Sequence, residues 1–438
     1  MPPSFTSFAT DLEPLQPFDT TPLREVASTA EKHRRRMTSP FQASAKWDDG
    51  WEELLKKEGV LLLDVRNADE VEQKAIKGSV HWPIALTDDP EARLKLAQAD
   101  GAIPADPSRP ILVFCRSGGR AARAAEGLRA LGFTNVANGG GIDEVNKHMT
   151  VRIQPFFDQA TNTVSYLVFD PVTRQGAVID PVLDWDSRSG EADTRSADRL
   201  IAAARQEGVS IALILESHAH ADHLTAAPYI KQQCGGKIGI GEHIKDVQHI
   251  FRPIFAAEDV KPGGGDFDLL FRDGEHLSLG SLAIEVIHTP GHTPACVCYR
   301  IGDDVFVGDT LFMHDFGTAR ADFPGGDARV LFRSIKRLLA LPPYTRLWMC
   351  HDYKAPGRDD YAWQSTVAEQ QAHNPHVKDG VTEDEFVALR EARDANLAAP
   401  ALLLPSIQVN IRAGRFPEAE SNGVRYLKIP VKLRGGLA

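Results

Sequence analysis

Short apolar runs alternate with polar segments of helical spacing in the first part of this chain. Residues 60–63 and 111–114 have the length and apolar character of buried strands. Residues 120–131 have helical spacing, and Gly132 marks the end of that helix. The pattern predicts a small α/β domain over residues 46–148, which is an ordinary size for one domain.

A second alternating segment begins at residue 149 and continues to residue 438. A helix is predicted over residues 196–206. Strands are predicted over residues 164–170, 176–180, 211–215, 282–287, 295–300, 304–307 and 346–349. Residues 242–265 end in three glycines, and we expect them to form a lid or a surface excursion. The pattern predicts a larger α/β domain over residues 149–438 with a closing C-terminal segment.

Composition adds limits on the class of protein. A chain of 438 residues favours two domains. Residues 1–45 are rich in proline, serine and threonine with weak periodicity, which predicts a loosely ordered extension. The net charge of -11 argues against nucleic acid as a partner, because phosphate contacts need clustered lysine and arginine.

The cysteines and the apolar runs bear on location. The five cysteines are an odd number spread along the chain, so they do not form a secreted disulfide framework. No run approaches the ~18 apolar residues of a membrane span. The first 20 residues have neither the basic start nor the apolar core of a secretory signal. By elimination we expect a cytoplasmic protein with no membrane partner.

The densest group of metal-ligating side chains follows the predicted strand at residues 211–215. His218, His220, Asp222 and His223 fall within six residues. A buried strand fixes the backbone there, while imidazole nitrogens and a carboxylate oxygen supply ligands. The group predicts a metal site, although Asp222 alone would also suit the cap of a helix beginning near Leu224.

Three more candidates occur later in the chain. His292 ends the segment His288-Thr-Pro-Gly-His292, and Asp309 and His351 each come just after a predicted strand. Side chains past strand ends meet where loops converge above a sheet. The full set therefore predicts one metal centre, although the same ligands accept zinc, iron or manganese.

The ordered set of candidates resembles the metallo-β-lactamase superfamily over roughly residues 150–360. The set is His218, His220, Asp222, His223, His292, Asp309 and His351. The resemblance implies an αββα sandwich with the metal at one edge of the paired sheets. This superfamily includes hydrolases and oxidoreductases, so the fold does not decide the chemistry.

The segment after Asp309 separates two subfamilies. Glyoxalase II enzymes hydrolyse a glutathione thioester at a dinuclear site and typically follow Gly-Asp-Thr with Gly-Cys-Gly-Arg. This chain has Arg320-Ala-Asp322-Phe323 instead, which resembles the persulfide dioxygenases, also called sulfur dioxygenases. That resemblance implies one Fe(II) per chain, held by His218, His292 and Asp309, with three positions left for the substrate sulfur and O₂.

The same resemblance implies roles for the remaining candidates. His220, Asp222, His223 and His351 would orient the ligands and hold water, or would bind a second metal. Arg320 and Tyr353 match positions that contact glutathione, although Arg320 also suits a surface salt bridge. Asp322 and Asp352 would support these residues. Residues 404–417 resemble the C-terminal end of bacterial persulfide dioxygenases, where Asn410 and Arg412 would close the structure.

A second reactive group lies in the first domain. The segment Cys115-Arg116-Ser117-Gly118-Gly119-Arg120 follows a predicted strand and precedes a helix. Backbone N–H groups and the helix N-terminus favour an anion there, so a thiol would ionise readily and stabilise a persulfide. An inert buried cysteine and a tyrosine-phosphatase loop are the alternatives, but the phosphatase loop has five residues between its cysteine and arginine, whereas here four intervene.

Together with Leu63-Asp64-Val65-Arg66 and the glycines at 139–141, this loop resembles the rhodanese domain over residues 47–148. The resemblance implies that Cys115 carries a persulfide, assisted by Arg116 and Arg120. The family often has Gly-His-Ile-Pro-Gly-Ala where this chain has residues 74–79, a departure that bears on donor preference.

The sequence therefore predicts a rhodanese fused to an Fe(II) persulfide dioxygenase. One half would oxidise glutathione persulfide with O₂ to sulfite and glutathione, and the other would move sulfane sulfur between glutathione persulfide, sulfite and thiosulfate. Two alternatives stay open: a dinuclear zinc thioester hydrolase with a rhodanese domain, and a sulfur carrier or sensor whose metal is structural. The oligomeric state also stays open, and a homo-oligomer is compatible with the sequence.

Overall fold

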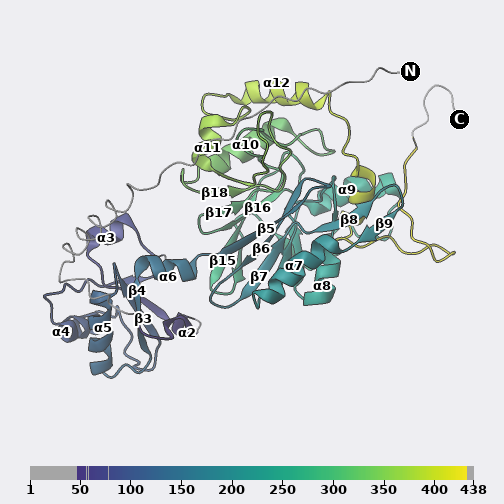
Figure 1. The fold of residues 1–438 in the computed structure, drawn as a ribbon. Helices are drawn as coiled ribbons and strands as arrows, with labels where there is room; N and C mark the ends of the chain where they lie inside the picture. The colour runs from purple at the N-terminus through teal and green to yellow at the C-terminus, as the bar shows by residue number, and fades with distance from the viewer. Residues whose placement is uncertain (1–46, 56, 58, 77, 432–438) are drawn as a thin grey trace, which may run out of the picture.

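The computed structural model describes residues 47–431 apart from residues 56, 58 and 77. The extension predicted for residues 1–45 lies outside the described residues. The described chain forms a smaller N-terminal unit and a larger C-terminal unit (Figure 1).

The N-terminal unit is built on a parallel four-stranded sheet in the order β2-β1-β3-β4. Its elements are α2 (Trp51–Leu55), β1 (Leu61–Asp64), α3 (Ala68–Gln73), β2 (Val80–His81), α4 (Pro90–Ala99), β3 (Ile111–Cys115), α5 (Gly119–Ala130), β4 (Val136–Gly141) and α6 (Ile142–Met149). All five residues of β3 are buried, because apolar clusters cover both faces of the sheet. A central strand covered on both sides explains the uninterrupted apolar run in the sequence.

The larger unit begins with a six-stranded sheet in the order β13-β12-β10-β7-β6-β5. The strands are β5 (Arg152–Asp158), β6 (Thr163–Phe169), β7 (Gln175–Ile179), β10 (Ser210–Leu215), β12 (Lys237–Gly241) and β13 (Leu269–Phe271). Three small strands form a separate sheet in the order β11-β8-β9. They are β8 (Val182–Asp186), β9 (Glu191–Asp193) and β11 (Leu224–Thr225). The helices α7 (Arg195–Gln206), α8 (Ala227–Cys234) and α9 (Ile244–Phe255) pack in one apolar cluster with this sheet.

A second six-stranded sheet has the order β14-β15-β16-β17-β18-β19. Its strands are β14 (His276–Leu279), β15 (Leu282–His288), β16 (Val297–Ile301), β17 (Asp304–Phe306), β18 (Arg346–Trp348) and β19 (Gln364–Thr366). The helices α10 (Ala328–Leu339), α11 (Val367–His373) and α12 (Glu383–Asp394) pack in one apolar cluster with this sheet, whereas α13 (Leu403–Asn410) packs with α9 and the first sheet.

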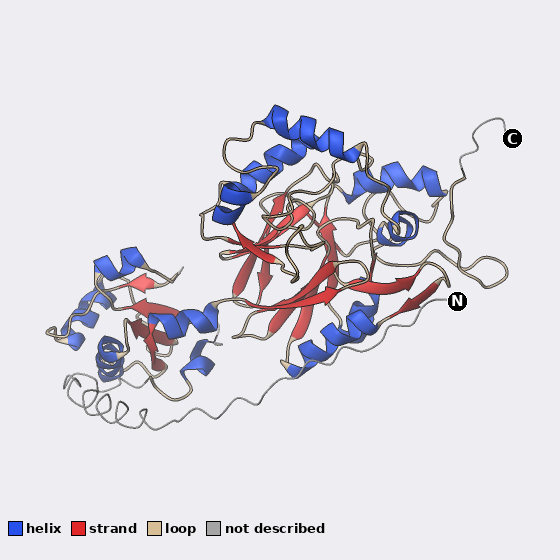
Figure 2. Cartoon of the chain, turned by 45° about the horizontal axis from the view of Figure 1, so that its top comes forward, coloured by secondary structure: helices blue, strands red, loops and turns tan. Residues whose placement is uncertain are grey.

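The two sheets pack face to face and helices cover both outer faces (Figure 2). Tyr166 and Leu215 of the first sheet share a buried cluster with Val286, Tyr299 and Phe306 of the second. Each sheet is therefore buried on one side against the other sheet and on the opposite side against helices. The fold confirms the predicted order of a rhodanese-like α/β unit followed by an αββα sandwich.

Two local predictions were wrong. Residues 242–265 are not a lid or an excursion, because α9 occupies much of this segment and buries Val247, Phe251 and Phe255 in the core. The proline at position 253 and the following glycines concealed its helical spacing. The helix expected near Leu224 begins three residues later, at Ala227 in α8, and its N-cap residue is Ala226, so Asp222 does not cap it.

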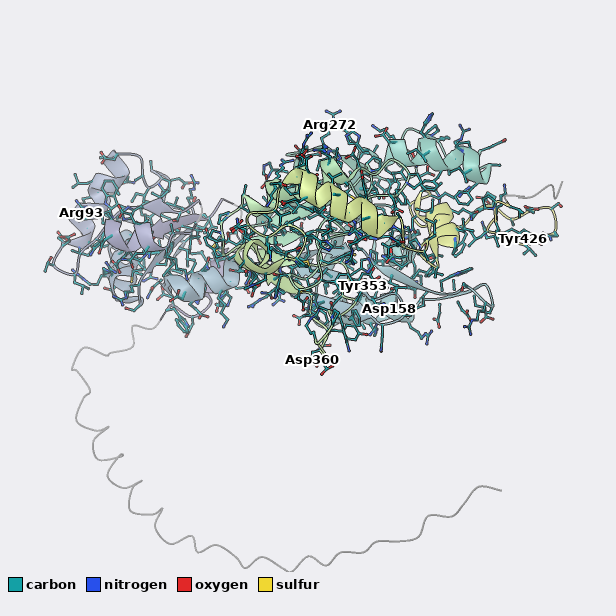
Figure 3. The ribbon with its side chains drawn as sticks, turned by 90° about the horizontal axis from the view of Figure 1, so that it is seen from above. Arg93, Asp158, Arg272, Tyr353, Asp360 and Tyr426 are labelled. Carbon is teal, nitrogen blue, oxygen red and sulfur yellow. The ribbon has the colours of Figure 1, made fainter. Side chains whose placement is uncertain are left out.

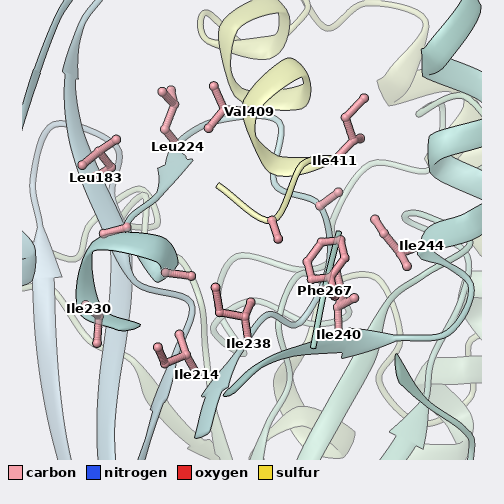
Figure 4. Close-up of a cluster of buried hydrophobic side chains, with 14 of the residues drawn as sticks. Leu183, Ile214, Leu224, Ile230, Ile238, Ile240, Ile244, Phe267, Val409 and Ile411 are labelled. Atoms are coloured by element: carbon pink, nitrogen blue, oxygen red, sulfur yellow. The ribbon is translucent and has the colours of Figure 1, made fainter. Parts of the chain in front are cut away.

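The C-terminal segment closes the larger unit from outside the two sheets. In Figure 4, Val409 and Ile411 of the C-terminal segment enter the same apolar cluster as Ile214 and Ile240 of the first sheet. The C-terminal segment therefore completes the core beneath residues 218–223, which we call the histidine-rich loop, although it lies almost 200 residues after Ile214 in the sequence.

The two units also share an apolar contact. Val172, in the turn between β6 and β7, lies in the buried cluster that contains Trp51 and Val145 of the N-terminal unit. None of the helices in the described ranges has both the length and the apolar character needed to cross a bilayer.

Candidate metal centre and thiol loop

The metal candidates converge although they come from four separate loops, which follow β10, β15, β17 and β18. His218 Nε2 and His292 Nε2 lie 3.8 and 3.7 Å from Asp309 Oδ2. These three side chains are buried, and their ligand atoms all lie within 4.8 Å of one another. His351 Nε2 lies 3.3 Å from the other Asp309 oxygen and 3.1 Å from Asp222. The side chains thus gather in one buried region, where they form several overlapping groups that could each hold a metal ion.

The facing atoms of this group lack hydrogen bonds within the described part of the chain. They are the Nε2 atoms of His218, His223 and His351, together with Oδ2 of Asp222 and Oδ1 of Asp309. Buried polar atoms are rarely left without partners, because desolvation then goes uncompensated. Imidazole nitrogens and carboxylate oxygens that face one another without hydrogen bonds fit a bound cation.

The opposite nitrogen of each imidazole is held by a neighbour. The Nδ1–H groups of His292, His223 and His351 donate to the carbonyls of Arg320, Leu224 and Asn162, at 2.7, 3.1 and 3.2 Å. His218 Nδ1 lies 3.0 Å from the Ser217 hydroxyl. Such contacts fix the ring orientation and leave Nε2 for a metal.

His220 is held in the reverse orientation. Its Nε2 lies 3.0 Å from Asp180 Oδ1 and 3.5 Å from Glu216 Oε2, so Nδ1 is the nitrogen without a partner. Asp180 also accepts a hydrogen bond from Ser217 N at 2.7 Å and has a left-handed backbone with φ 49°. Strained backbone of this kind is concentrated at functional sites. Through its contacts with Ser217 and His220, Asp180 anchors the start of the histidine-rich loop.

The local electrostatics separate His220 from its neighbours. Burial lowers the pKa of His218 well below its usual value and that of His223 to about 3, so both rings are neutral and able to bind a metal. Burial opposes charge on His220 as well, but the Asp180 carboxylate prevails and raises the pKa of His220 well above 6.5.

The C-terminal helix clamps the histidine-rich loop. Asn410 Nδ2 donates to the carbonyls of His220 and His223, both at 2.8 Å, and its Oδ1 accepts from Thr225 N. Arg412 pairs with Asp259 at 2.6 Å. These contacts support the interpretation that Asn410 and Arg412 close the structure.

A cavity of about 450 Å³ opens beside the metal candidates. Asp222, His292 and Asp309 form part of its wall, and Arg320 and Tyr353 line it as well. The Tyr353 ring is stacked on that of His351, with centroids 5.5 Å apart. The cavity is large enough for a small organic ligand.

The supporting carboxylates hold these cavity residues in place. Asp322 accepts two hydrogen bonds from the Arg320 guanidinium, at 2.6 and 2.7 Å, so the salt bridge considered for Arg320 is present in a residue that also lines the cavity. Asp352 accepts from Arg358 at 2.6 Å and from Ala362 N at 2.8 Å, which fixes the loop after His351.

In the N-terminal unit, Cys115 ends β3 at the base of a tight loop. Its Sγ accepts a hydrogen bond from Gly118 N at 3.1 Å. Gly118 has φ 95°, a conformation that glycine adopts without strain, and α5 begins at the next residue. Arg116 is exposed at the loop surface. The arrangement places the Gly118 N–H and the N-terminal end of α5 beside the sulfur.

Arg120 does not point freely into this loop. Its guanidinium makes two hydrogen bonds to the Glu70 carboxylate, at 2.7 and 2.8 Å. Glu70 lies on α3, and Arg66 holds that helix by donating to the Glu70 carbonyl at 2.8 Å. Arg66 is itself paired with Asp64 at 2.7 Å. The motif Leu-Asp-Val-Arg thus supports the loop indirectly.

Comparison with known proteins agrees with both units. The family model described as rhodanese-like domain matches residues 49–148, and that of the metallo-beta-lactamase superfamily matches residues 159–351. A Burkholderia pseudomallei protein named probable metallo-hydrolase is 54% identical over 290 residues, which are 64% of this chain and 98% of that protein. The chain belongs to the metallo-beta-lactamase superfamily. It carries a rhodanese-like domain before its metallo-beta-lactamase domain.

Other relatives of the metallo-beta-lactamase domain have different names. Glyoxylase B2 of Dictyostelium discoideum is 47% identical over 64% of this chain and 97% of its own length. The persulfide dioxygenase ETHE1 of Homo sapiens is 26% identical over 60% of this chain and 89% of its own length. The superfamily fold implies a bound metal ion, and the identity of that metal is a separate question.

Several residues of these two sites were missed in the sequence. Asp180 lies at the end of a predicted strand, and the candidate ligands also lie just past strand ends. Its partner His220, however, is 40 residues away in the sequence. Glu70 lies on a helix whose exposed positions carry many charges, so no local pattern distinguishes it. Their roles depend on contacts that only the folded chain creates.

The Glu70–Arg120 pair predicts a pH dependence of stability. The hydrogen bonds from Arg120 lower the pKa of Glu70 from 4.5 to about 2. The unfolded chain therefore takes up this proton first as the pH falls, so the stabilisation is complete above about pH 5 and is lost between 4.5 and 2. We expect Glu70→Gln to lower the free energy of unfolding at neutral pH, and the difference from the natural protein to shrink at pH 3. Urea unfolding of both full-length proteins at the two pH values measures this, and an unchanged difference would contradict it.

Proposed function

We propose that this protein is an Fe(II)-dependent persulfide dioxygenase fused to a persulfide sulfurtransferase. The observation that carries the proposal is the set His218, His292 and Asp309, whose ligand atoms form a compact buried group that does not include His220. Two histidines and one carboxylate are the ligand set of non-haem iron oxygenases, and they leave coordination positions for a substrate and O₂. The overall reaction converts glutathione persulfide, O₂ and water to glutathione and sulfite.

His218, His292 and Asp309 are the residues that would hold the iron, since they are buried and their ligand atoms all lie within 4.8 Å of one another. When bound, Fe(II) supplies the capacity to activate O₂ beside a sulfur ligand. The main-chain carbonyl of Arg320 orients His292, and its guanidinium lines the cavity where the tripeptide would bind. The segment containing Arg320 therefore connects the proposed iron ligand with the proposed substrate site.

The other cavity residues would position the substrate. Tyr353 and Arg320 would contact the glutathione moiety, while Phe312 and Phe316 form an apolar wall that excludes water from the reacting sulfur. Asp222, His223 and His351 would hold water and orient the ligands. Asp322 and Asp352 would keep Arg320 and the loop after His351 in place.

In the rhodanese-like domain, Cys115 would act as the nucleophile. Its thiolate attacks the terminal sulfur of glutathione persulfide, so a Cys115 persulfide forms and glutathione leaves as the thiolate. Sulfite then takes that sulfur as thiosulfate and restores the Cys115 thiolate. The Gly118 N–H stabilises the anionic sulfur, and the exposed Arg116 would bind the sulfite, while Arg120 keeps the loop on Glu70. One half would make sulfite and the other would consume it. Joining the two domains in one chain raises the concentration of sulfite near the domain that consumes it.

A second candidate is a dinuclear zinc enzyme that hydrolyses a glutathione thioester. The observation that favours it is a further buried group, formed by His220, Asp222 and His223, which offers a second metal position. The names metallo-hydrolase and glyoxylase B2 among the relatives point in the same direction.

Metal analysis and substrate tests distinguish the two candidates. The proposal expects about one iron per chain and no hydrolysis of a glutathione thioester. Two zinc ions per chain together with rapid thioester hydrolysis would favour the second candidate. A protein that accepts sulfur on Cys115 but never consumes oxygen would instead be a carrier or sensor.

A further inference from the structure

Three arginines line the cavity beside the metal centre, and they differ in their partners. Arg320 is paired with Asp322 at 2.6 Å, and the buried Arg390 is paired with Asp394 at 2.6 Å. Arg393 has neither an ion pair nor a side-chain hydrogen bond to any residue in the described part of the chain. Of the three arginines, Arg393 is therefore the one whose charge is not paired with a carboxylate in the described part of the chain.

The position of Arg393 directs it toward the cavity. It lies in the last turn of α12, three residues after Arg390, and residues so spaced share one face of a helix. Both line the cavity. The same two charges also act on the buried His376: burial first, and then the charges of Arg390 and Arg393, lower the pKa of His376 to about 4.

The cavity thus combines two kinds of wall. Asp222, His292 and Asp309 at the candidate metal centre contribute one part, and the exposed Arg393, which has no ion-pair partner among the described residues, lines the same open cavity. Phe316 and the half-exposed Leu397 add apolar surface. A small organic molecule with a reactive sulfur and a separate carboxylate matches this arrangement, because a guanidinium binds carboxylates through two parallel hydrogen bonds.

We propose that Arg393 binds a carboxylate of the thiol that carries the persulfide and so selects anionic thiols over neutral ones. This inference rests on the proposed function and adds a specificity-determining residue to it. The competing explanation is that Arg393 only stabilises the C-terminal end of α12, where a positive charge is favourable.

Kinetics with a charged and a neutral substrate separate these explanations. We expect Arg393→Ala to raise KM for glutathione persulfide about tenfold, to leave kcat nearly unchanged, and to leave KM for mercaptoethanol persulfide, which has no carboxylate, unaltered. Arg393→Lys should recover part of the loss. The matched control is Arg205→Ala, which removes an exposed arginine from the last turn of α7, away from the cavity, and should change neither KM.

Two results would overturn the inference: an unchanged KM for glutathione persulfide in Arg393→Ala, or an equal rise in KM for both substrates. Calorimetric binding of glutathione separates this failure from that of the proposed function. If the natural protein binds glutathione but consumes no oxygen, the proposed function is wrong. If the natural protein and Arg393→Ala bind glutathione equally, the inference about Arg393 is wrong.

Discussion

Replacing Asp309 with alanine is expected to remove the bound metal and to lower oxygen consumption with glutathione persulfide at least about a hundredfold. Asp309 contributes oxygens on both sides of the centre, since Oδ2 faces His218 and His292 while Oδ1 faces His351. Without it, two imidazoles remain, which bind a divalent metal weakly. Sulfur transfer through Cys115 should persist, because that thiol lies in the other unit. Metal content, oxygen uptake and thiosulfate turnover measure the three effects.

A matched control removes a carboxylate from the same hairpin. Asp303 is exposed in the turn between β16 and β17, so Asp303→Ala should keep both activities. The reciprocal variant Cys115→Ser should lose sulfur transfer and keep oxygen uptake. Seen from above, Arg93 marks the N-terminal unit at one end of the molecule and Tyr353 the larger unit (Figure 3). If Asp309→Ala abolished both activities in a folded protein, the division of functions between the units would be wrong.

Replacing Gly291 with alanine is expected to have a comparable effect through the backbone. Gly291 has φ 132°, and a Cβ there would lie 2.3 Å from the backbone of Leu331 in α10. The added atom forces the turn that carries His292 away from this helix. We expect a loss of about 3 to 5 kcal/mol in the free energy of unfolding of the metallo-beta-lactamase domain, together with weaker metal binding. Urea unfolding and metal titration measure the two quantities.

Gly302→Ala provides the control for that variant. Gly302 also has a positive φ, 62°, but no atom lies within 4 Å of a Cβ at that position. Gly302→Ala should therefore lower the free energy of unfolding only by the cost of the backbone conformation, about 1 to 2 kcal/mol, and should keep its metal. Equal losses in the two variants would show that the contact with α10 is unimportant.

The sequence predicted those parts of the fold that local pattern determines. The apolar runs at 111–114 and 211–215 became the buried strands β3 and β10, and the ligands that follow β10 converge because loops at one edge of a sheet meet. The helix α9 was missed because an internal proline and nearby glycines resemble a loop. Proline and glycine usually mark turns and loops, so the sequence pattern does not predict a helix in a segment that contains them.

Residues that act through distant partners were beyond the sequence. Asn410 clamps the loop of His220 from 190 residues away, and only its similarity to a family segment suggested a closing role. Asp180 and Glu70 gain their importance from the rings and guanidinium groups that folding brings to them. The candidate ligands themselves were found because histidine and aspartate past a strand end are chemically conspicuous.

The most direct test of the account is oxygen consumption by the iron-loaded full-length protein supplied with glutathione persulfide. We expect one O₂ to disappear for each sulfite formed, and we expect Cys115→Ser to behave like the natural protein in this assay. An iron-loaded protein that consumes no oxygen, while its zinc form hydrolyses a glutathione thioester, would contradict it.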